Sequence, residues 1–204
     1  MTIWFTADPH IGHMAIISHS NRPFKNVDQM DDVLLGFWKN LLSSGDRLYI
    51  VGDIAMNRRG VLKAFDSLPS GVQVYVIFGN HDHDHRNAID TNRSVVWSGS
   101  LKEAKIEGQD ITMSHYAGRV WNRCHYGSWQ LFGHSHGKLH PWERQLDVGV
   151  DSAAELLGEY RPFSFEEVHK FIKHGENPRC LAEQFGKAPS WMGGNHLPAR
   201  TLKG

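Results

Sequence analysis

Three short apolar runs separated by two helical patterns constrain the fold of the first half of the chain most strongly. The runs cover residues 2–7, 48–51 and 72–78, and each stops at a turn that contains glycine or proline. Between them, residues 27–42 and 61–68 carry apolar side chains at helical spacing. This alternation predicts parallel strands joined by crossover helices.

The second half of the chain has a different pattern, in which short apolar segments follow one another with tight connections. Beyond about residue 93, candidate strands cover residues 95–97, 101–106, 111–114, 128–132 and 146–150. We expect these strands to form a second, more antiparallel sheet.

Capping signals mark the starts of two helices. Asn26 and Gln29 have the spacing of a capping box before the first helical stripe. Ser164 and Glu167 repeat this spacing, which predicts a final helix from Ser164 to about His174.

The length of the chain indicates one domain. A chain of 204 residues is long enough for one buried core and too short for two full-sized domains. Its hydrophobic fraction of 40% is typical of globular proteins. We therefore predict one domain over residues 1–174, followed by an irregular tail over residues 175–204 to which no function is assigned. The sequence does not indicate an oligomeric state.

Composition excludes several functional classes. Lys plus Arg equals Asp plus Glu at 22 each, so no net positive charge favours a long nucleic acid. The N-terminus has neither a basic region nor a long apolar stretch, so we expect no secretory signal, no membrane association and a cytoplasmic location. Two cysteines are too few for a disulfide framework. The 14 histidines cluster mainly around residues 10, 81, 115 and 135, which is where a functional site is expected.

Each of the first three predicted strands is followed by a residue that can bind a metal ion. These residues are Asp8, Asp53 and Asn80. In open α/β sheets, ligands bind outside the carboxyl ends of the strands. We therefore expect the three side chains to converge on one crevice.

Histidines extend this set to seven candidate ligands. Asp8 and His10 lie two residues apart, as do His134 and His136, and in extended backbone this spacing directs both side chains to one side, so each pair could hold one ion. The seventh candidate is His115. Oxygen and nitrogen donors without sulfur suit Mn²⁺, Fe, Zn²⁺ or Ni²⁺. Seven ligands exceed the needs of one tetrahedral ion, whereas two ions sharing a carboxylate would use them all.

Five ordered motifs resemble those of the calcineurin-like metallophosphoesterase superfamily. They are Asp8-Pro9-His10, Gly52-Asp53, Gly79-Asn80-His81-Asp82, His115 and Gly133-His134-Ser135-His136. Each motif is weak alone, but all five in this order are highly specific. The context, including Asn21-Arg22-Pro23-Phe24, is similar to small stand-alone bacterial and phage members.

The resemblance implies a fold and a ligand arrangement. The implied fold is a four-layer α/β/β/α sandwich with two mixed β-sheets. Asp8, His10 and His136 would hold a first ion, and Asn80, His115 and His134 would hold a second. Asp53 would bridge the two ions, for which Mn²⁺ is the leading candidate.

The resemblance and the chemistry of phosphate esters suggest roles for further residues. A hydroxide bound to the metal ions would attack phosphorus. His81 is the candidate general acid for the leaving group, and Asp82 is the candidate for orienting it. Arg22 and Arg119 are candidates for gripping phosphate oxygens, and Tyr116 is a candidate for stacking on a base or sugar.

The leading functional prediction is hydrolysis of a small phosphodiester or phosphomonoester, with a nucleotide-like substrate preferred. A metal-dependent nuclease is the first alternative, although the balanced charge does not favour nucleic acid. A non-catalytic scaffold that binds other proteins is the second alternative, disfavoured because the chain retains the ligands and the candidate acid.

Overall fold

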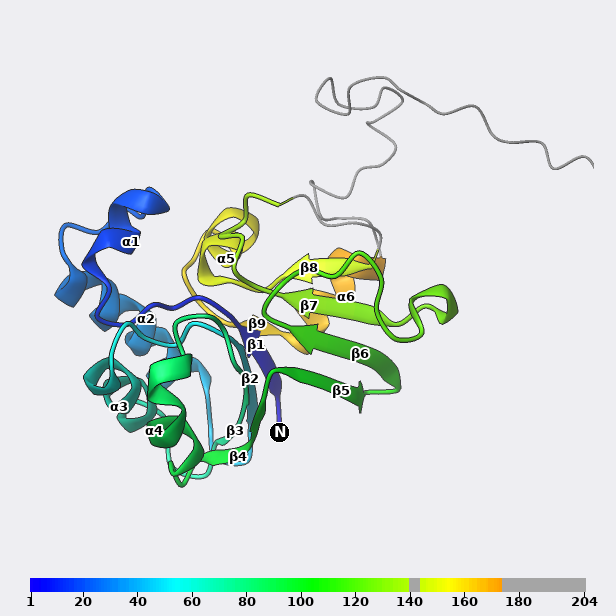
Figure 1. Ribbon diagram of the computed structural model, residues 1–204, viewed down its shortest axis with the longest axis horizontal. Coiled ribbons are helices and arrows are strands. Elements are labelled where there is room, and N and C mark those ends of the chain that lie inside the picture. Colours follow the sequence, from blue (N-terminus) through cyan, green and yellow to red (C-terminus); the bar gives the residue numbers. More distant parts are fainter. Residues whose placement is uncertain (140–143, 174–204) are drawn as a thin grey trace, which may run out of the picture.

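The computed structural model describes residues 1–139 and 144–173 (Figure 1). The predicted tail, residues 175–204, lies outside the described residues, so the division of the chain at residue 174 stays a prediction. Among the residues that the structure describes, no helix has the length and apolar composition needed to cross a lipid bilayer.

The first sheet contains the three strands expected from the apolar runs. They are β1 (Ile3–Thr6), β2 (Arg47–Val51) and β3 (Gln73–Ile77), which pair in parallel. Two further strands complete the order β4-β3-β2-β1-β9, with β4 (Val95–Gly99) parallel to β3 and β9 (Phe163–Ser164) antiparallel to β1. The prediction of a parallel sheet in the first half is confirmed.

The second sheet differs from the prediction in two respects. It has the order β5-β6-β7-β8, formed by β5 (Leu101–Ile106), β6 (Gln109–Ser114), β7 (Trp129–Phe132) and β8 (Gln145–Asp147). The strand predicted at residues 95–97 is β4, which belongs to the first sheet instead. Only β5 and β6 pair antiparallel, whereas β6–β7 and β7–β8 are parallel, so a predominantly antiparallel sheet is wrong.

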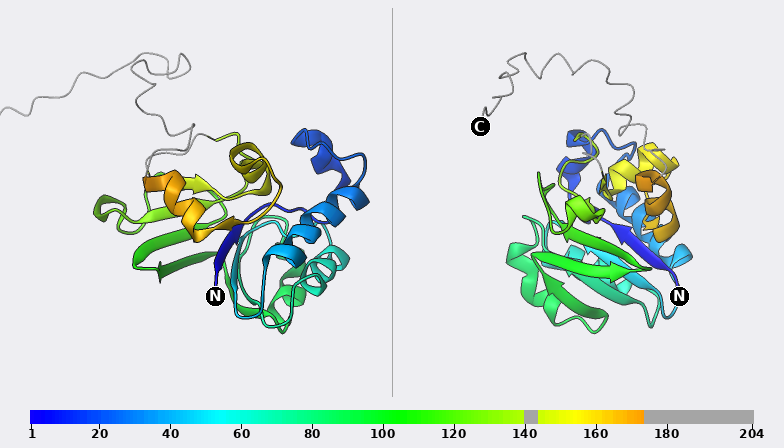
Figure 2. Two further views of the ribbon diagram at one scale, coloured as in Figure 1. Left: turned by 180° about the vertical axis from the view of Figure 1, so that it is seen from behind. Right: turned by 90° about the vertical axis from the view of Figure 1, so that its right-hand side faces the viewer.

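Helices connect and cover the two sheets. On the side of the first sheet lie α1 (Met14–His19), α2 (Val27–Leu41), α3 (Arg58–Asp66) and α4 (Arg86–Asp90). Two short 3₁₀ segments occur at His83–His85 and Cys124–Tyr126. On the side of the second sheet lie α5 (Val150–Leu157) and α6 (Phe165–Lys173), and α6 contacts β8, β9 and β1 (Figure 2). The predicted four-layer α/β architecture with two mixed β-sheets is confirmed.

Alternating side chains of the central strands form two separate cores. Leu48 and Ile50 of β2 face a core built with α2 and α3, whereas Tyr49 and Val51 face a core between the two sheets. The second sheet supplies Met113, Leu131 and Leu146 to that inner core. Burial of both faces explains why the strands of the first sheet are continuous apolar runs rather than alternating ones.

The predicted capping box forms completely at α6 and only in part at α2. Glu167 N donates to Ser164 Oγ (3.2 Å) and Ser164 N donates to Glu167 Oε2 (2.8 Å), which is a complete capping box at the start of α6. At α2, Gln29 N donates to Asn26 Oδ1 (2.9 Å), but the Gln29 side chain accepts from Lys25 N (2.7 Å) instead of from Asn26 N. At α2, the Gln29 side chain therefore caps the backbone N–H of the residue before Asn26.

Candidate metal centre

The loops that follow three parallel strands of the first sheet and two parallel strands of the second meet at one edge of the sandwich. Those after β1, β2 and β3 carry Asp8, Asp53 and Asn80, and those after β6 and β7 carry His115, His134 and His136. Backbone hydrogen bonds join these loops, from Asp8 N to Gly52 O (3.0 Å) and from Gly133 N to His115 O (3.0 Å). The expected convergence at the carboxyl ends of the strands therefore occurs.

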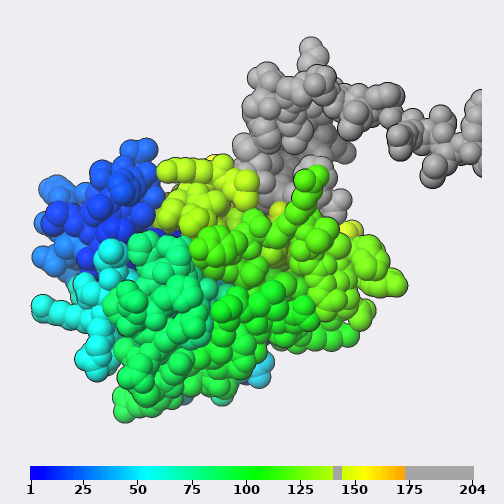
Figure 3. All heavy atoms as spheres, viewed as in Figure 1, coloured from blue at the N-terminus to red at the C-terminus, as the bar shows by residue number. Residues whose placement is uncertain are grey.

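The segment around α1 forms one border of this region. On the face in Figure 3, this segment and the segment after β7 lie side by side at the surface. Lys138 Nζ donates to the carbonyl oxygen of His19 across this boundary (3.1 Å). This contact holds α1 next to the loop that carries His134 and His136.

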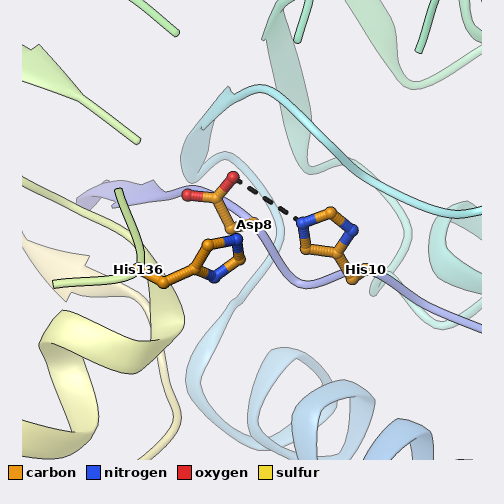
Figure 4. A group of neighbouring side chains, drawn as sticks. All are labelled: Asp8, His10 and His136. Carbon is orange, nitrogen blue, oxygen red and sulfur yellow. Dashed lines mark ion pairs between the residues drawn. The ribbon is translucent and has the colours of Figure 1, made fainter. Parts of the chain in front are cut away.

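A first group of potential ligands consists of Asp8, His10 and His136, whose side chains point toward one another (Figure 4). Their donor atoms lie within 4.8 Å of one another, and His10 Nε2 lies 4.0 Å from Asp8 Oδ1. Asp8 and His10 are almost completely buried, and His136 is partly buried. This group is therefore deep in the protein.

A second group consists of Asp53, His115 and His134. Asp53 and His115 are buried, whereas His134 is exposed. Asn80, also exposed, directs Oδ1 to within 3.2 Å of His115 Nε2, so its amide oxygen lies next to this group. The second group therefore opens toward solvent.

Asp53 lies between the two groups. Its Oδ2 is 3.6 Å from His10 Nε2 and 3.4 Å from His115 Nε2. Its other oxygen, Oδ1, accepts a hydrogen bond from His81 N (2.9 Å). One carboxylate oxygen is thus within reach of histidines from both groups.

The backbone around the ligands departs from the extended conformation that the spacing argument assumed. Asp8, His10, Asp53, His134 and His136 all have positive φ, between 48° and 65°. These left-handed conformations are uncommon for residues other than glycine and concentrate at functional sites. His134 and His136 lie in different groups, so the geometry does not favour one ion shared by this pair.

Two glycines allow the loops to approach the ligands. A Cβ on Gly52, which has φ +94°, would overlap the His115 ring. A Cβ on Gly133 would lie 2.6 Å from Asp8 Oδ2. Both positions therefore require a residue without a Cβ.

The buried donor atoms fit a bound cation. Asp8 Oδ1 and His10 Nε2 are buried and have no hydrogen-bond partner among the described residues, which would be costly for groups without a ligand. Burial raises the pKa of Asp8 to about 8, although His115 and His136 lie close enough to oppose the effect. Burial lowers the pKa of His10 to about 2, so its imidazole is neutral, as a metal ligand requires. A divalent cation would supply the countercharge that the Asp8 carboxylate needs.

The remaining nitrogens of the buried histidines are fixed by neighbours. His115 Nδ1 lies 2.9 Å from Val51 O, so it donates to that carbonyl. Burial acts to lower the pKa of His115, but the hydrogen bond to Asp53 and the nearby Asp8 carboxylate raise it to about 9, so a cation bound at Nε2 would displace a proton. His10 Nδ1 lies 3.3 Å from His13 Nδ1, and His136 Nδ1 lies 2.7 Å from Asp151 Oδ2. Such partners commonly fix the tautomer of a metal-binding histidine.

Two buried aspartates hold the ligand loops through backbone contacts. Asp82, fully buried, accepts from Asp53 N (2.8 Å), Gly79 N (2.8 Å) and Ile54 N (3.0 Å). These contacts fix the Asp53 loop, and among the described residues Asp82 makes no hydrogen bond to the ring of His81. Asp147 accepts from Gly137 N (2.9 Å) and from the Ser135 hydroxyl. These two contacts hold the loop that carries His134 and His136.

The three substrate-binding candidates occupy different positions. Arg22 is buried, and its guanidinium faces the protein interior behind the first group, where phosphate could not reach it. Arg119 is exposed in the loop after β6. Tyr116 is 54% exposed, its ring lies 4.6 Å from that of His134, and its hydroxyl donates to Asn80 Oδ1 (3.3 Å). Tyr116 therefore borders the open group, whereas Arg22 does not face it.

Sequence reasoning missed Asp147, Asp151 and His13. Asp151 directly follows the predicted strand 146–150, where the same rule that found Asp8 and Asp53 could have identified it. Asp147 lies inside that predicted strand and is the last residue of β8 only in the structure. His13 lies three residues after His10, next to the first motif.

Comparisons with known proteins agree with the fold. The family model described as calcineurin-like phosphoesterase matches residues 1–197. An uncharacterized protein of Methanocaldococcus jannaschii is 24% identical over 187 residues, which cover 88% of this chain and 96% of the relative. The gene 66 protein of Mycobacterium phage D29 is 26% identical, with 76% of this chain and 90% of the relative covered.

A solved structure supports the architecture independently. A protein of unknown function from Aquifex aeolicus superimposes with a TM-score of 0.62 at 20% identity. The match covers 84% of this chain and 99% of that protein. At this level of identity the likeness concerns the fold alone.

Proposed function

Because the chain belongs to the calcineurin-like phosphoesterase family, we propose that it hydrolyses a small phosphodiester or phosphomonoester with the help of two divalent metal ions. The observation that carries this proposal is the position of Asp53, whose Oδ2 lies 3.4 to 3.6 Å from histidines of both ligand groups. A carboxylate between two clusters of nitrogen and oxygen donors is suited to bridging two ions.

In the proposed site, Asp8, His10 and His136 hold one ion, while Asn80, His115 and His134 hold the other. The donors are oxygen and nitrogen only, which suits Mn²⁺ first, with Fe, Zn²⁺ or Ni²⁺ as alternatives. When bound, such ions activate a water molecule for attack on phosphorus and neutralise charge on the phosphate oxygens. The protein itself fixes the geometry, through the left-handed turns at the ligands and the buried aspartates behind them.

His81 is the proposed general acid. Its ring centroid lies 5.2 Å from that of His10 and 5.7 Å from that of His13, and the residue is partly exposed. Its backbone N–H is fixed by Asp53, so the imidazole is held beside the shared carboxylate. From this position the side chain could donate a proton to the leaving oxygen of a substrate bound at the open group.

A nucleotide-like substrate is proposed from the border of the site. The exposed Tyr116 ring lies against His134 and offers a flat surface to a base or sugar. Replacing Tyr116 by Ala should raise KM for nucleotide substrates more than for a small model ester. Tyr116→Phe should keep the stacking surface and remove only the hydroxyl contact to Asn80.

The deciding experiment is a screen of the Mn²⁺-reconstituted protein against cyclic nucleotides, nucleoside monophosphates, dinucleotides and bis(p-nitrophenyl) phosphate. Turnover that depends on added metal is expected for at least one of these esters. Binding of two ions without turnover of any ester would contradict the enzymatic proposal and favour a scaffold.

His81→Gln tests the role of the acid. We expect kcat to fall by about 100- to 10,000-fold, because the leaving group loses its proton donor. Metal content should stay unchanged, and His83→Gln, at an exposed histidine two residues further along, is the matched control. Loss of an ion in His81→Gln would make His81 a ligand instead, since it also lies in a group with His10 and Asp53.

A further inference from the structure

The side chain of Arg22 is completely enclosed and uses every N–H that it has. Nε and one terminal nitrogen bind the two oxygens of Asp151, each at 2.8 Å. The terminal nitrogens also donate to Asp8 O (2.8 Å), to Pro9 O (3.1 Å) and to Met30 Sδ (3.4 Å). The accessible surface of the Arg22 side chain is 0%.

Asp151 connects this guanidinium to a candidate ligand. Its Oδ2 lies 2.7 Å from His136 Nδ1. Because an ionised carboxylate only accepts hydrogen bonds, His136 must carry its proton on Nδ1. The free Nε2 then faces Asp8 and His10, as a metal ligand requires.

The same guanidinium also holds the turn that presents the other two ligands of the first group. Asp8 and His10 have φ of 55° and 52°, conformations that persist only when surrounding contacts hold them. Arg22 donates to the carbonyls of Asp8 and Pro9, which lie between these two left-handed residues. One side chain therefore contacts the backbone of the first motif and, through Asp151, the imidazole of the last.

Stability alone is a poor explanation for this arrangement. A buried ion pair loses hydration that its mutual attraction only partly replaces, so it is weak evidence for a stabilising role. The chain contains a second bidentate pair for comparison, Arg161 with Glu167, whose two N–H···O distances are 2.7 and 3.0 Å. That pair lies at the start of α6, makes no contact with a candidate ligand and is partly exposed.

We propose that Arg22 and Asp151 are positioning residues that set the affinity of the Asp8–His10–His136 group for its ion. Asp151 fixes the tautomer and orientation of His136, and Arg22 holds Asp151 and the Asp8–Pro9 turn in one rigid unit. This unit meets the second group at Asp8, whose Oδ2 accepts from His134 N and whose Oδ1 lies 4.0 Å from His115 Nδ1. This inference rests on the proposed function, because it assumes that the first group binds a divalent ion.

The test measures Mn²⁺ binding by calorimetry and by metal analysis of the full chain. Asp151→Asn preserves shape but replaces one acceptor oxygen with a donor, and Arg22→Lys keeps the charge but not the planar fork. Each variant should weaken one of two Mn²⁺ sites by about 10- to 100-fold, the range found for partners of metal ligands. The other site should bind as in the wild type, and Glu167→Gln and Arg161→Lys should leave both sites unchanged.

Nuclear magnetic resonance of the imidazole nitrogens supplies a readout that a general loss of stability would not produce. In the wild-type protein without metal, His136 should be protonated on Nδ1, and in Asp151→Asn the Nε2 tautomer should appear. Circular dichroism would show whether each variant is folded. If Arg22→Lys fails to fold, Asp151→Asn decides the question alone, and Asp151→Glu replaces it if it too is unfolded.

The outcomes separate this inference from the proposed function. A wild-type protein that binds no divalent ion would refute both. Two ions bound with wild-type affinity by folded Asp151→Asn, with an unchanged His136 tautomer, would overturn the positioning role and leave the proposed function intact. Equal loss of affinity in Glu167→Gln would also overturn it, by showing a non-specific effect.

Discussion

The two ligand groups of this site differ in how firmly the protein holds them. In the first group, Asp8 and His10 are buried. Asp8 accepts from His134 N, His10 contacts His13, and His136 contacts Asp151. In the second group, Asp53 and His115 have such contacts, but His134 and the adjoining Asn80 are exposed. One half of the site is built into the core and the other is open.

This difference suggests how the proposed metal centre would combine a firmly held ion with access for a substrate. Buried, pre-oriented ligands lose little freedom when an ion binds, so we expect the first group to bind its ion more tightly. Exposed ligands must be ordered on binding, so the second ion should exchange more readily. The open group also borders Tyr116, where we propose that the substrate binds.

The largest effect is expected at the residue that belongs to both halves. Asp53→Asn keeps the shape and the acceptor for His81 N but removes the charge that would bridge the ions. Affinity for both ions should fall and metal-dependent hydrolysis should become undetectable, because neither half is complete without the carboxylate. Metal analysis and the model-ester assay would measure this loss.

Asp84→Asn is the matched control for that change, since Asp84 is an exposed carboxylate in the segment that follows the Gly79-Asn80-His81-Asp82 motif. It should retain both ions and full activity. A variant at Asp53 that lost only one ion would show that the two groups are not joined by this residue.

A smaller effect, confined to one half, is expected from His134→Gln. The exposed imidazole contributes only to the second group, so one Mn²⁺ site should weaken by more than about 100-fold, beyond the range seen for outer partners. The tighter site should be unchanged in calorimetry. His136→Gln should produce the opposite pattern, with loss of the tighter site.

If His134→Gln and His136→Gln lowered the Mn²⁺ affinity of both sites equally, the distinction between a buried and an open half would be wrong. The comparison would also fail if His134→Gln abolished the tighter site.

The sequence predicted the convergence of the candidate ligands because the signal is local. Asp8, Asp53 and Asn80 each follow a recognisable apolar strand, and the rule that ligands collect at the carboxyl ends of parallel strands needs no long-range information. The contacts behind the ligands are not local. Arg22 and Asp151 are separated by 129 positions in the chain, and no spacing pattern joins them. The sequence pattern does not distinguish a buried arginine that holds a loop from an exposed arginine that binds a phosphate.

Sheet membership was predicted less well than strand existence, for a related physical reason. β4 is short and only partly buried, so its apolar pattern does not show which strand it will pair with. Its parallel pairing with β3 requires a crossover, which the short helix α4 provides over only five residues. Five residues are too few for a helical stripe to emerge, and the prediction therefore placed this strand in the wrong sheet.

The smallest effect on the site is expected from Asp46→Asn, at the amino end of β2 and thus at the far end of the strand that leads to Asp53. The buried Asp46 carboxylate accepts from Thr2 N (2.6 Å), Ser43 N (3.0 Å) and Trp4 Nε1 (3.2 Å). Burial acts to raise the pKa of Asp46, but these hydrogen bonds outweigh it and the pKa is lowered. The substitution should reduce the free energy of unfolding by about 1–3 kcal/mol at neutral pH.

The pH dependence of the stability difference shows that the ionised Asp46 carboxylate stabilises the fold. A carboxyl group whose pKa is lower in the folded than in the unfolded state stabilises the fold above its ordinary pKa, about 3.9, and loses this contribution as the pH falls through the lowered value. The difference in unfolding free energy between wild type and Asp46→Asn should therefore be constant near neutrality and shrink below about pH 4. Both Mn²⁺ sites should bind as in the wild type at pH 7. A change at either site would mean that the amino end of the sheet contributes to the ligand geometry, and that the difference between the buried and open halves does not arise from their immediate neighbours alone.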